Sequence, residues 1–299
     1  MTQAEERLDR VGLATAFGAY FIWGFLPVFF KQVQGVLALE IIAHRVAWAV
    51  PFLLLIMAFR RQLGEYWAAL TAWTTLRWML VSAALISVNW LIYVWAVNGG
   101  HILAASLGYF LNPLLNILLG TVFLKERLNR TQWIAVGIAS IGVAILATGA
   151  FDTLWISVSL ALSFGFYGLV RKLAPTGAVP GLGVETTLLL PLAIAGMWWF
   201  AKDASAGFGS DGYTDLILIA GGAVTAIPLL LFATAARRMP YSVLGFIQYI
   251  GPTIQFLLGY FVYHEELSGP RLLCFGLIWL ALAIFSCDAL RRMRSNSLA

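Results

Sequence analysis

The stretch Pro113–Leu128, PLLNILLGTVFLKERL, decides how the chain is organised, because it returns as Pro252–Leu267, PTIQFLLGYFVYHEEL. Both stretches read P-x4-L-L-G-x5-E-x-L, and they begin 139 residues apart in a chain of 299. An offset close to half the chain indicates two related halves.

The composition places both halves in a membrane. Hydrophobic residues make up 61% of the chain and charged residues 11%, against roughly a quarter charged in soluble domains. The mean hydropathy is +0.86. These values exclude a cytosolic enzyme, a disordered chain and a disulfide-stapled secreted domain.

Apolar runs recur along the chain, and each is about 20 residues long, enough to cross a bilayer as a helix. Strands of a transmembrane barrel are half that length and alternate with polar positions. We therefore predict an all-α polytopic membrane protein. Its ten transmembrane helices are expected near residues 11–30, 38–59, 76–97, 102–124, 130–149, 153–171, 181–201, 214–236, 241–263 and 270–289.

Basic residues predict the orientation. With the N-terminus inside, most of the 19 Lys and Arg residues fall in inner segments, and Lys31, Lys202 and Arg271 fall in outer ones. The positive-inside rule then predicts a bacterial-type inner membrane protein with both termini cytoplasmic. This topology explains the basic balance, so no nucleic-acid partner is expected. Arg171 and Lys172 are expected to anchor at inner phosphates.

Each half holds five helices, residues 1–150 and 151–299. Because five is odd, the second half must enter the membrane from the opposite side, which makes an inverted repeat. Such repeats are common in secondary transporters that work by alternating access. A membrane scaffold or receptor, and less readily an intramembrane enzyme, remain the alternatives.

Seven stretches carry a resemblance to a known family: AYFIWG (19–24), AHRVAW (43–48), NWLIYVWAVN (89–98), SLGYFLNPLLN (106–116), FGFYGLVRK (164–172), QYIGPT (248–253) and FGLIWLALAIF (275–285). In these stretches the chain resembles the drug/metabolite transporter superfamily, in its EamA group, and within it the RarD family, often labelled chloramphenicol-sensitive protein. The resemblance implies ten helices, cytoplasmic ends and a central cavity that exports or exchanges a small organic metabolite or drug-like compound. It supplies no substrate.

Ionisable residues at membrane depth are costly and therefore mark candidate sites. In the second helix, Glu40 and His44 share a face, and Arg45 lies about 10 Å below the helix start. They are candidates for proton coupling, titration and anion binding. The alternatives are a buried ion pair that locks this helix and an anchor at the outer headgroups.

Glu185 is the next candidate, in the helix that corresponds to the second one. A symmetric gate or proton site is one interpretation. The other is that Glu185 stabilises the start of its helix electrostatically. Glu126 and Glu265 are expected to pair with nearby basic residues at the two interfaces.

Amide and aromatic side chains form the third group. They either line a wet cavity or bond neighbouring helices, and the prolines are candidate hinges beside the substrate because proline breaks the backbone ladder. Aromatic residues here also suit lipid-facing or core positions. The candidates are Asn89, Tyr93, Tyr109, Asn112, Asn116, Gln248, Tyr249 and Gln255, the hinges Pro113 and Pro252, and the aromatic walls Tyr20, Trp23 and Tyr167.

Motifs for other chemistry are missing from the sequence. It contains no GxxxxGK[ST] loop, HExxH or GxSxG, and its three histidines are far apart. We predict no enzymatic activity, no metal and no cofactor. The expected partners are a small-molecule substrate, the lipid bilayer and a proton as the candidate coupling ion, with the oligomeric state left open.

Overall fold

The computed structural model describes residues 9–98, 101–202, 206–264 and 269–297, and within these ranges it contains helices and no strand. The elements are α1 (Arg10–Phe30), η1 (Lys31–Val33), α2 (Ala38–Phe59), α3 (Leu63–Thr71), α4 (Trp73–Asn98), α5 (Ile102–Phe123), α6 (Arg130–Ala147), η2 (Thr148–Thr153), α7 (Leu154–Leu173), α8 (Ala178–Phe200), α9 (Gly212–Arg238), α10 (Tyr241–Gln248), α11 (Ile250–Phe261) and α12 (Gly269–Ser297).

The described residues hold ten segments long and apolar enough to cross a membrane, which confirms the predicted all-α class and helix count. Two features were not predicted. The ninth span divides into α10 and α11 at Tyr249. The short helix α3 lies between the second and third predicted spans, where no helix was predicted.

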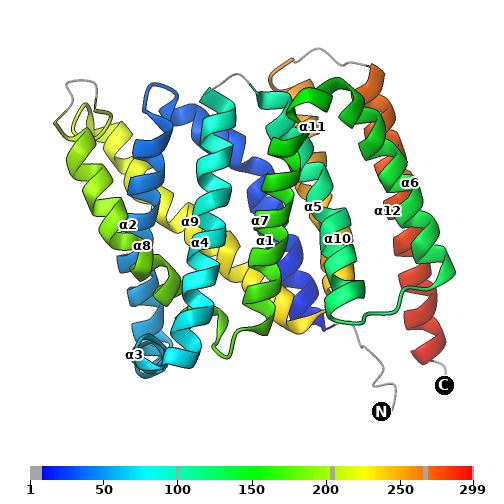
Figure 1. Cartoon of the computed structure of the whole chain (residues 1–299), viewed down its shortest axis with the longest axis horizontal. Coiled ribbons are helices and arrows are strands. Elements are labelled where there is room, and N and C mark those ends of the chain that lie inside the picture. The colour runs from blue at the N-terminus through cyan, green and yellow to red at the C-terminus, as the bar shows by residue number, and fades with distance from the viewer. Residues whose placement is uncertain (1–8, 99–100, 203–205, 265–268, 298–299) are drawn as a thin grey trace. The chain divides into compact units, whose positions relative to one another are not determined.

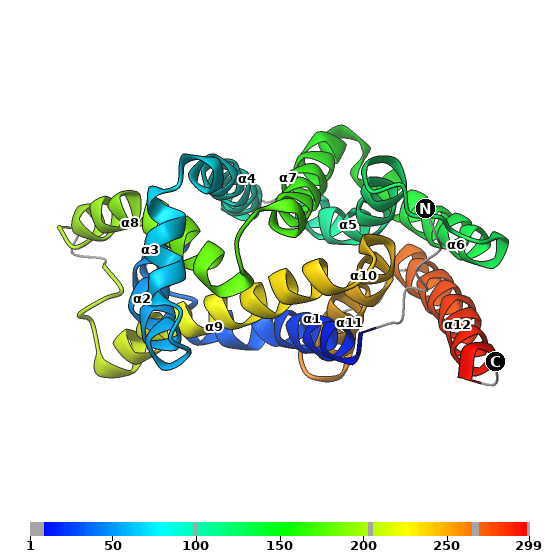
Figure 2. The ribbon, with the colours of Figure 1, turned by 90° about the horizontal axis from the view of Figure 1, so that it is seen from below.

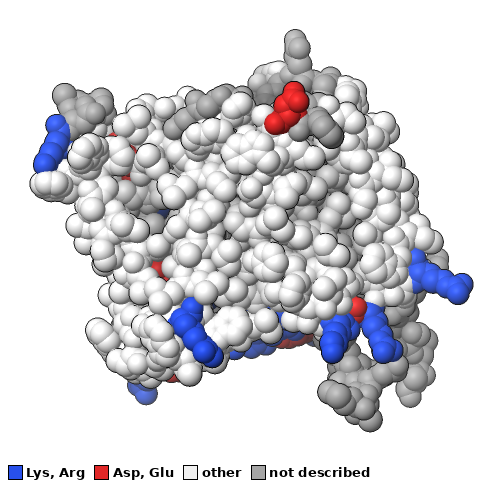
Figure 3. All heavy atoms as spheres, in the orientation of Figure 1, with Lys and Arg blue, Asp and Glu red and all other residues white. Residues whose placement is uncertain are grey.

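Helix α3 lies across the ends of its neighbours, since Figure 1 shows it end-on while the adjoining α2 and α4 run in the plane of the page. Tyr66 and Ala69 are buried, whereas Trp67 is 61% exposed. A short helix with one buried face and an exposed Trp suits the membrane interface, where aromatic rings are enriched. Figure 3 agrees with a membrane setting, because mostly uncharged side chains cover the surface between the helix ends.

The helices form two compact units, and each unit takes segments from both halves of the sequence. Unit 1 comprises residues 1–94 and 166–239, and unit 2 comprises residues 95–165 and 240–299. The chain passes from one unit to the other within α4, within α7 and between α9 and α10.

In unit 1, α9 packs along α1 and α2, and α2 packs against α8 (Figures 1 and 2). Glycine makes the closest of these approaches possible. A Cβ added to Gly222 on α9 would lie 2.6 Å from the backbone nitrogen of Ala49 on α2. Small residues at such crossings let membrane helices pack through their backbones.

In unit 2, α5 packs against α10, and α6 packs against α12. The core is aromatic and aliphatic. Phe110 meets Phe275 edge-on with ring centroids 5.2 Å apart, and Phe246 stacks on Phe285 at 3.9 Å. Ala135 and Ala139 of α6 are fully buried in this core, so they pack closely against neighbouring helices as small residues do in membranes.

Acidic and amide side chains cap the N-termini of several helices. Asp9 caps α1, Asp211 caps α9, and Asn129 with Gln132 forms a capping box on α6. A hydrogen bond from Arg238 to Asp9, at 2.7 Å, holds the pKa of that carboxyl below its usual range.

Glu126 caps the start of α10, a helix that is distant from it in the sequence. Its two carboxylate oxygens accept hydrogen bonds from the backbone N–H groups of Tyr241 and Ser242, at 2.6 and 2.8 Å, in the first turn of α10. A Cβ on Gly120 would lie 2.6 Å from this carboxylate. The expected interfacial pairing with a nearby Arg is therefore replaced by a helix cap, which suits an anion at a helix start. Glu265, its counterpart in the repeat, lies outside the described residues.

We expect Gly222→Ala to destabilise the protein by roughly 1–3 kcal/mol, because the added methyl group overpacks the crossing of α2 and α9. Thermal unfolding of the detergent-purified protein measures this change. Gly212→Ala, at the start of the same helix where no atom lies within 4 Å of the added Cβ, is the matched control. Equal melting temperatures for the two variants would contradict the close approach.

Candidate functional site

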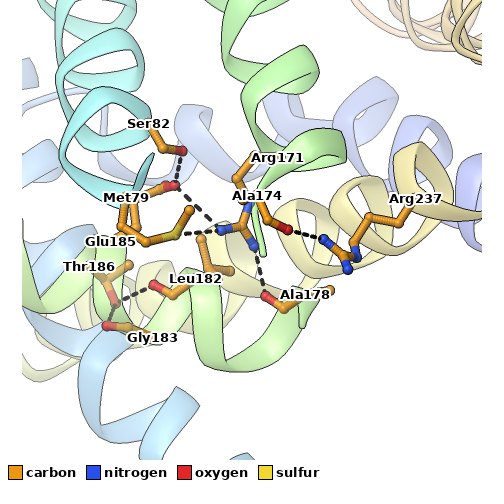
Figure 4. Close-up of polar contacts among 10 residues, drawn as sticks. All are labelled: Met79, Ser82, Arg171, Ala174, Ala178, Leu182, Gly183, Glu185, Thr186 and Arg237. Carbon is orange, nitrogen blue, oxygen red and sulfur yellow. Dashed lines mark hydrogen bonds and ion pairs between the residues drawn. The ribbon is translucent and has the colours of Figure 1, made fainter. Parts of the chain in front are cut away.

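The most deeply buried charged pair lies in unit 1, where Arg171 of α7 meets Glu185 of α8 (Figure 4). The Arg171 Nη1 atom lies 4.0 Å from Glu185 Oε2, and both side chains are at most 2% exposed. Ser82 of α4 donates a short hydrogen bond to the same carboxylate oxygen. Three helices therefore contribute to one buried polar cluster.

The rest of the guanidinium is bound to backbone and sulfur. Arg171 Nη2 donates to the carbonyl oxygen of Ala178 at 2.8 Å, and Nη1 contacts the Met79 sulfur at 3.2 Å. Gly181 makes room, since a Cβ there would lie 2.6 Å from Nη1. The partners of a buried charge compensate the cost of removing it from water, so loss of one partner strongly destabilises the folded protein.

Arg171 was expected to anchor at lipid phosphates, and that prediction is wrong because the side chain is buried. Lys172 also serves the fold, since its ammonium donates to the carbonyl oxygens of Ala236 and Met239 at 2.8 and 2.7 Å. In return, Arg237 donates to the carbonyl oxygen of Ala174 at 2.7 Å (Figure 4). The ends of α7 and α9 thus cap each other with cations, as the helix dipole favours.

The three predicted wall aromatics come together beside this pair. Tyr167 stacks on Phe232 of α9 with centroids 6.2 Å apart, and Tyr20 and Trp23 of α1 contact the same ring at 6.3 and 5.7 Å. Tyr167 also interacts with the Glu185 carboxyl. Tyr20 and Tyr167 are buried within unit 1, so these two face neighbouring helices.

Glu40 is buried at the start of α2. Its carboxylate accepts hydrogen bonds from the backbone N–H groups of Gly207 and Phe208 at 3.0–3.1 Å, and it is 1% exposed. His44, one turn on, stacks on the Phe208 ring at 4.6 Å and accepts a hydrogen bond from Trp48. Both residues therefore hold the connection between α8 and α9 against α2.

Arg45 faces a different environment. Its Nε donates to the Thr225 hydroxyl of α9 at 2.6 Å, and its guanidinium lies over the rings of Phe30 and Trp90 at 5.2 and 5.4 Å. The side chain is only partly buried. Hydroxyl and aromatic contacts of this kind orient a guanidinium.

Trp90, which the sequence did not single out, also borders an apolar cleft between α2, α4 and α8. The cleft has a volume of about 310 Å³ and lies within unit 1, at the lower end of the range for small-molecule pockets. Its walls are almost entirely hydrophobic. They are formed by Leu39, Ile42, Ala43, Val46, Ser87, Trp90, Leu91, Leu189, Leu192, Ala193, Gly196, Trp199 and Phe200.

Unit 2 brings together the predicted amides. Asn116 of α5 donates from Nδ2 to Gln248 Oε1 of α10 at 2.7 Å, and both side chains are buried. Asn112, one turn earlier on α5, is 3% exposed. The Tyr249 hydroxyl donates to the carbonyl oxygen of Phe110 at 3.4 Å. The amide pair of Asn116 and Gln248 joins α5 to α10.

The remaining candidates are more dispersed. Asn89, Tyr93 and Gln255 are partly buried, and Tyr109 is 41% exposed. Pro113 and Pro252 are buried, and α5 continues through Pro113. Among the described residues, no three His, Cys, Asp or Glu side chains gather as a metal site.

The chain is similar to known proteins over nearly its whole length. A family model described as the EamA-like transporter family matches residues 10–148. The chain is 45% identical to the "Uncharacterized transporter PA0485" of Pseudomonas aeruginosa, covering 95% of this chain and 96% of that protein. It is 44% identical to "Protein RarD" of Escherichia coli, covering 98% and 99%. A solved crystal structure shares the fold with a TM-score of 0.71 at 18% identity, over 91% of this chain and 96% of the other.

We expect Glu40→Ala to lower the free energy of unfolding by about 1.5–3 kcal/mol, because two backbone amides lose a charged acceptor. Thermal unfolding and limited proteolysis near residues 206–211 measure the loss. Glu65→Ala, an exposed carboxylate on α3, is the control. An unchanged stability with lost transport would instead assign Glu40 to function.

Proposed function

Because the chain belongs to the EamA-like transporter family and, within it, to the RarD proteins, we propose that it is a secondary transporter of a small organic compound. It is a multi-pass membrane protein with ten candidate spans in its described residues. Its relatives carry the names of transporters rather than enzymes. Alternating access, with export or exchange of a metabolite or drug-like molecule, is the proposed mechanism.

Pairing between corresponding helices supports an inverted repeat of residues 1–150 and 151–299. The motif offset makes α2 the counterpart of α8, α5 the counterpart of α10 and α11, and α6 the counterpart of α12. In each of these three cases the helix packs against its own counterpart. Such contacts are expected where a two-fold axis passes between two halves. Pro51 and Pro191, inside α2 and α8, keep nearly the same offset.

The observation that carries the proposal is the equivalence of Arg45 and Glu185. Each is the eighth residue of its helix, α2 or α8, about 10 Å from the helix start. Arg45 binds a hydroxyl on α9, Thr225, and Glu185 binds a hydroxyl on α4, Ser82. Helices α4 and α9 are also counterparts, so each charged residue bonds a hydroxyl on a corresponding helix, although Ser82 is the tenth residue of α4 and Thr225 the fourteenth of α9.

Charged groups at this depth are costly unless they serve a pathway or a relay. In the proposed mechanism Arg45, near the outer side, binds an anionic group of the substrate, and Glu185, near the inner side, carries the coupling proton. Partly buried Asn89 and Tyr93 are proposed cavity-lining residues, and the break at Tyr249 beside Pro252 is the proposed hinge. Both termini are proposed to be cytoplasmic, in a bacterial-type inner membrane.

The function is tested first by a thermal-shift screen of the purified protein against amino acids, organic acids, amines and chloramphenicol, since a ligand of the native state raises the melting temperature. Stabilising compounds are then tested for counterflow in proteoliposomes. Saturable counterflow supports transport. Stable, monodisperse protein that binds a compound without any flux would favour a receptor or scaffold.

We expect Arg45→Ala to weaken binding of anionic compounds about 10–100-fold, because one charge-assisted contact is lost. Binding is read from the ligand-dependent thermal shift. Arg60→Ala, an exposed arginine at the end of the same helix, should leave binding unchanged. If Arg45→Ala instead prevents accumulation in the membrane, Arg45 is structural.

We expect Glu185→Gln to reduce transport driven by a proton gradient at least about tenfold while counterflow persists, since an amide cannot carry a proton across the cycle. Flux in proteoliposomes with and without an imposed pH gradient separates the two activities. Glu65→Gln on the exposed face of α3 is the control. Gradient-driven flux that survives in Glu185→Gln would remove this residue from coupling.

A further inference from the structure

Unit 2 holds a group of buried oxygen acceptors at the point where the ninth membrane span breaks. We propose that these acceptors bind a sodium ion between α5 and the junction of α10 and α11. The proposal concerns ion binding in unit 2 and does not depend on the transport role proposed for Arg45 and Glu185.

Two amide oxygens carry the inference. Asn112 and Asn116 lie one turn apart on α5, so their side chains share a face. They are 3% and 0% exposed, and Oδ1 of each accepts no hydrogen bond from the described part of the chain. Buried polar atoms nearly always have a partner, so two adjacent acceptors without donors point to a ligand that supplies positive charge.

The facing helix adds acceptors of its own. Gln248 Oε1 accepts a hydrogen bond from Asn116 Nδ2 and keeps a second lone pair. Helix α10 ends at Gln248, where the helix dipole places partial negative charge on the last carbonyls. Pro252 has no N–H, so it cannot donate to the Gln248 carbonyl one turn back. Broken helices in transporters use such carbonyls and helix C-termini to coordinate Na⁺.

The depth of the group suits a coupling or structural ion. Asn112 and Asn116 lie about 15 and 21 Å along α5, a helix about 33 Å long. The break at Tyr249 lies about 12 Å into its span. Both positions fall in the middle of the membrane, where no bulk water is at hand to satisfy an acceptor.

Packing favours a bare ion over an organic cation. A Cβ on Gly245 would lie 2.6 Å from the Pro113 carbonyl oxygen and 3.2 Å from Asn116 Cβ. The backbones of α10 and α5 therefore approach closely beside the amides. An organic ammonium would need space here for its carbon atoms, whereas an ion does not.

The chemistry of the ligands favours a monovalent ion. The acceptors are neutral amide and backbone oxygens, which are hard ligands. The Glu126 carboxylate, which lies at the contact of α5 and α10, is bound to the first turn of α10, at the end opposite Gln248. Without a carboxylate ligand the group lacks the negative charge that sites for divalent ions supply.

The test is the melting temperature of the full-length purified protein as choline chloride is replaced by NaCl at constant ionic strength. Binding to the native state predicts a saturable rise of roughly 2 °C or more in Na⁺. KCl is the second salt. An equal response to all three salts, or stabilisation by K⁺ alone, would overturn the sodium site.

Two variants locate the ion. Asn112→Leu has nearly the same volume and removes an acceptor, so it should abolish the Na⁺-dependent rise, whereas Thr121→Val on the same helix should retain it. Asn112→Asp adds a negative charge and should lower the half-saturating Na⁺ concentration severalfold. This second variant keeps the site testable if Asn112→Leu does not fold. A Na⁺ response unaltered by either substitution at Asn112 would place the ion elsewhere.

Discussion

The hydrocarbon core of a membrane offers a polar group no partner, so a polar side chain or helix end within the spans of this chain must find one in the chain itself or in a bound ligand. Ser and Thr hydroxyls bond the preceding turn of their own helix, as Ser140 does with Val136 and Thr186 with Leu182. Ionised groups need more, and they recruit neighbouring helices. Arg171 takes the Ala178 carbonyl, Met79 and Glu185.

The same requirement explains the motif that repeats along the chain. Its Gly120 leaves space for its Glu126, and that carboxylate closes the start of α10. A motif that reads as an apolar helix followed by an interfacial acid is therefore a device that joins two helices. The same two residue types recur in the second copy of the motif, as Gly259 and Glu265.

Three polar residues close together on α2 make different kinds of contact. Glu40 and His44 hold the connection that precedes α9, so their burial is explained by structure. Arg45, the next residue, turns to Thr225 and two aromatic rings and stays partly exposed. Adjacent charges on one helix point in different directions because a helix rotates by about 100° per residue. The sequence alone places all three within six residues of α2 and cannot distinguish these contacts.

What the sequence determined by itself is what depends on local composition and period: ten spans, the all-α class, the repeated motif and the family, each readable because lipid demands long apolar helices. The aromatic group of Tyr20, Trp23 and Tyr167 and the amide pair of Asn116 and Gln248 were foreseen only as lists of residue types. Their partners, the burial of Arg171, the cap made by Glu126 and the break at Tyr249 were decided by tertiary structure. These features depend on which helices meet and at what height, and contacts between residues more than 100 positions apart leave no periodic signal in the chain.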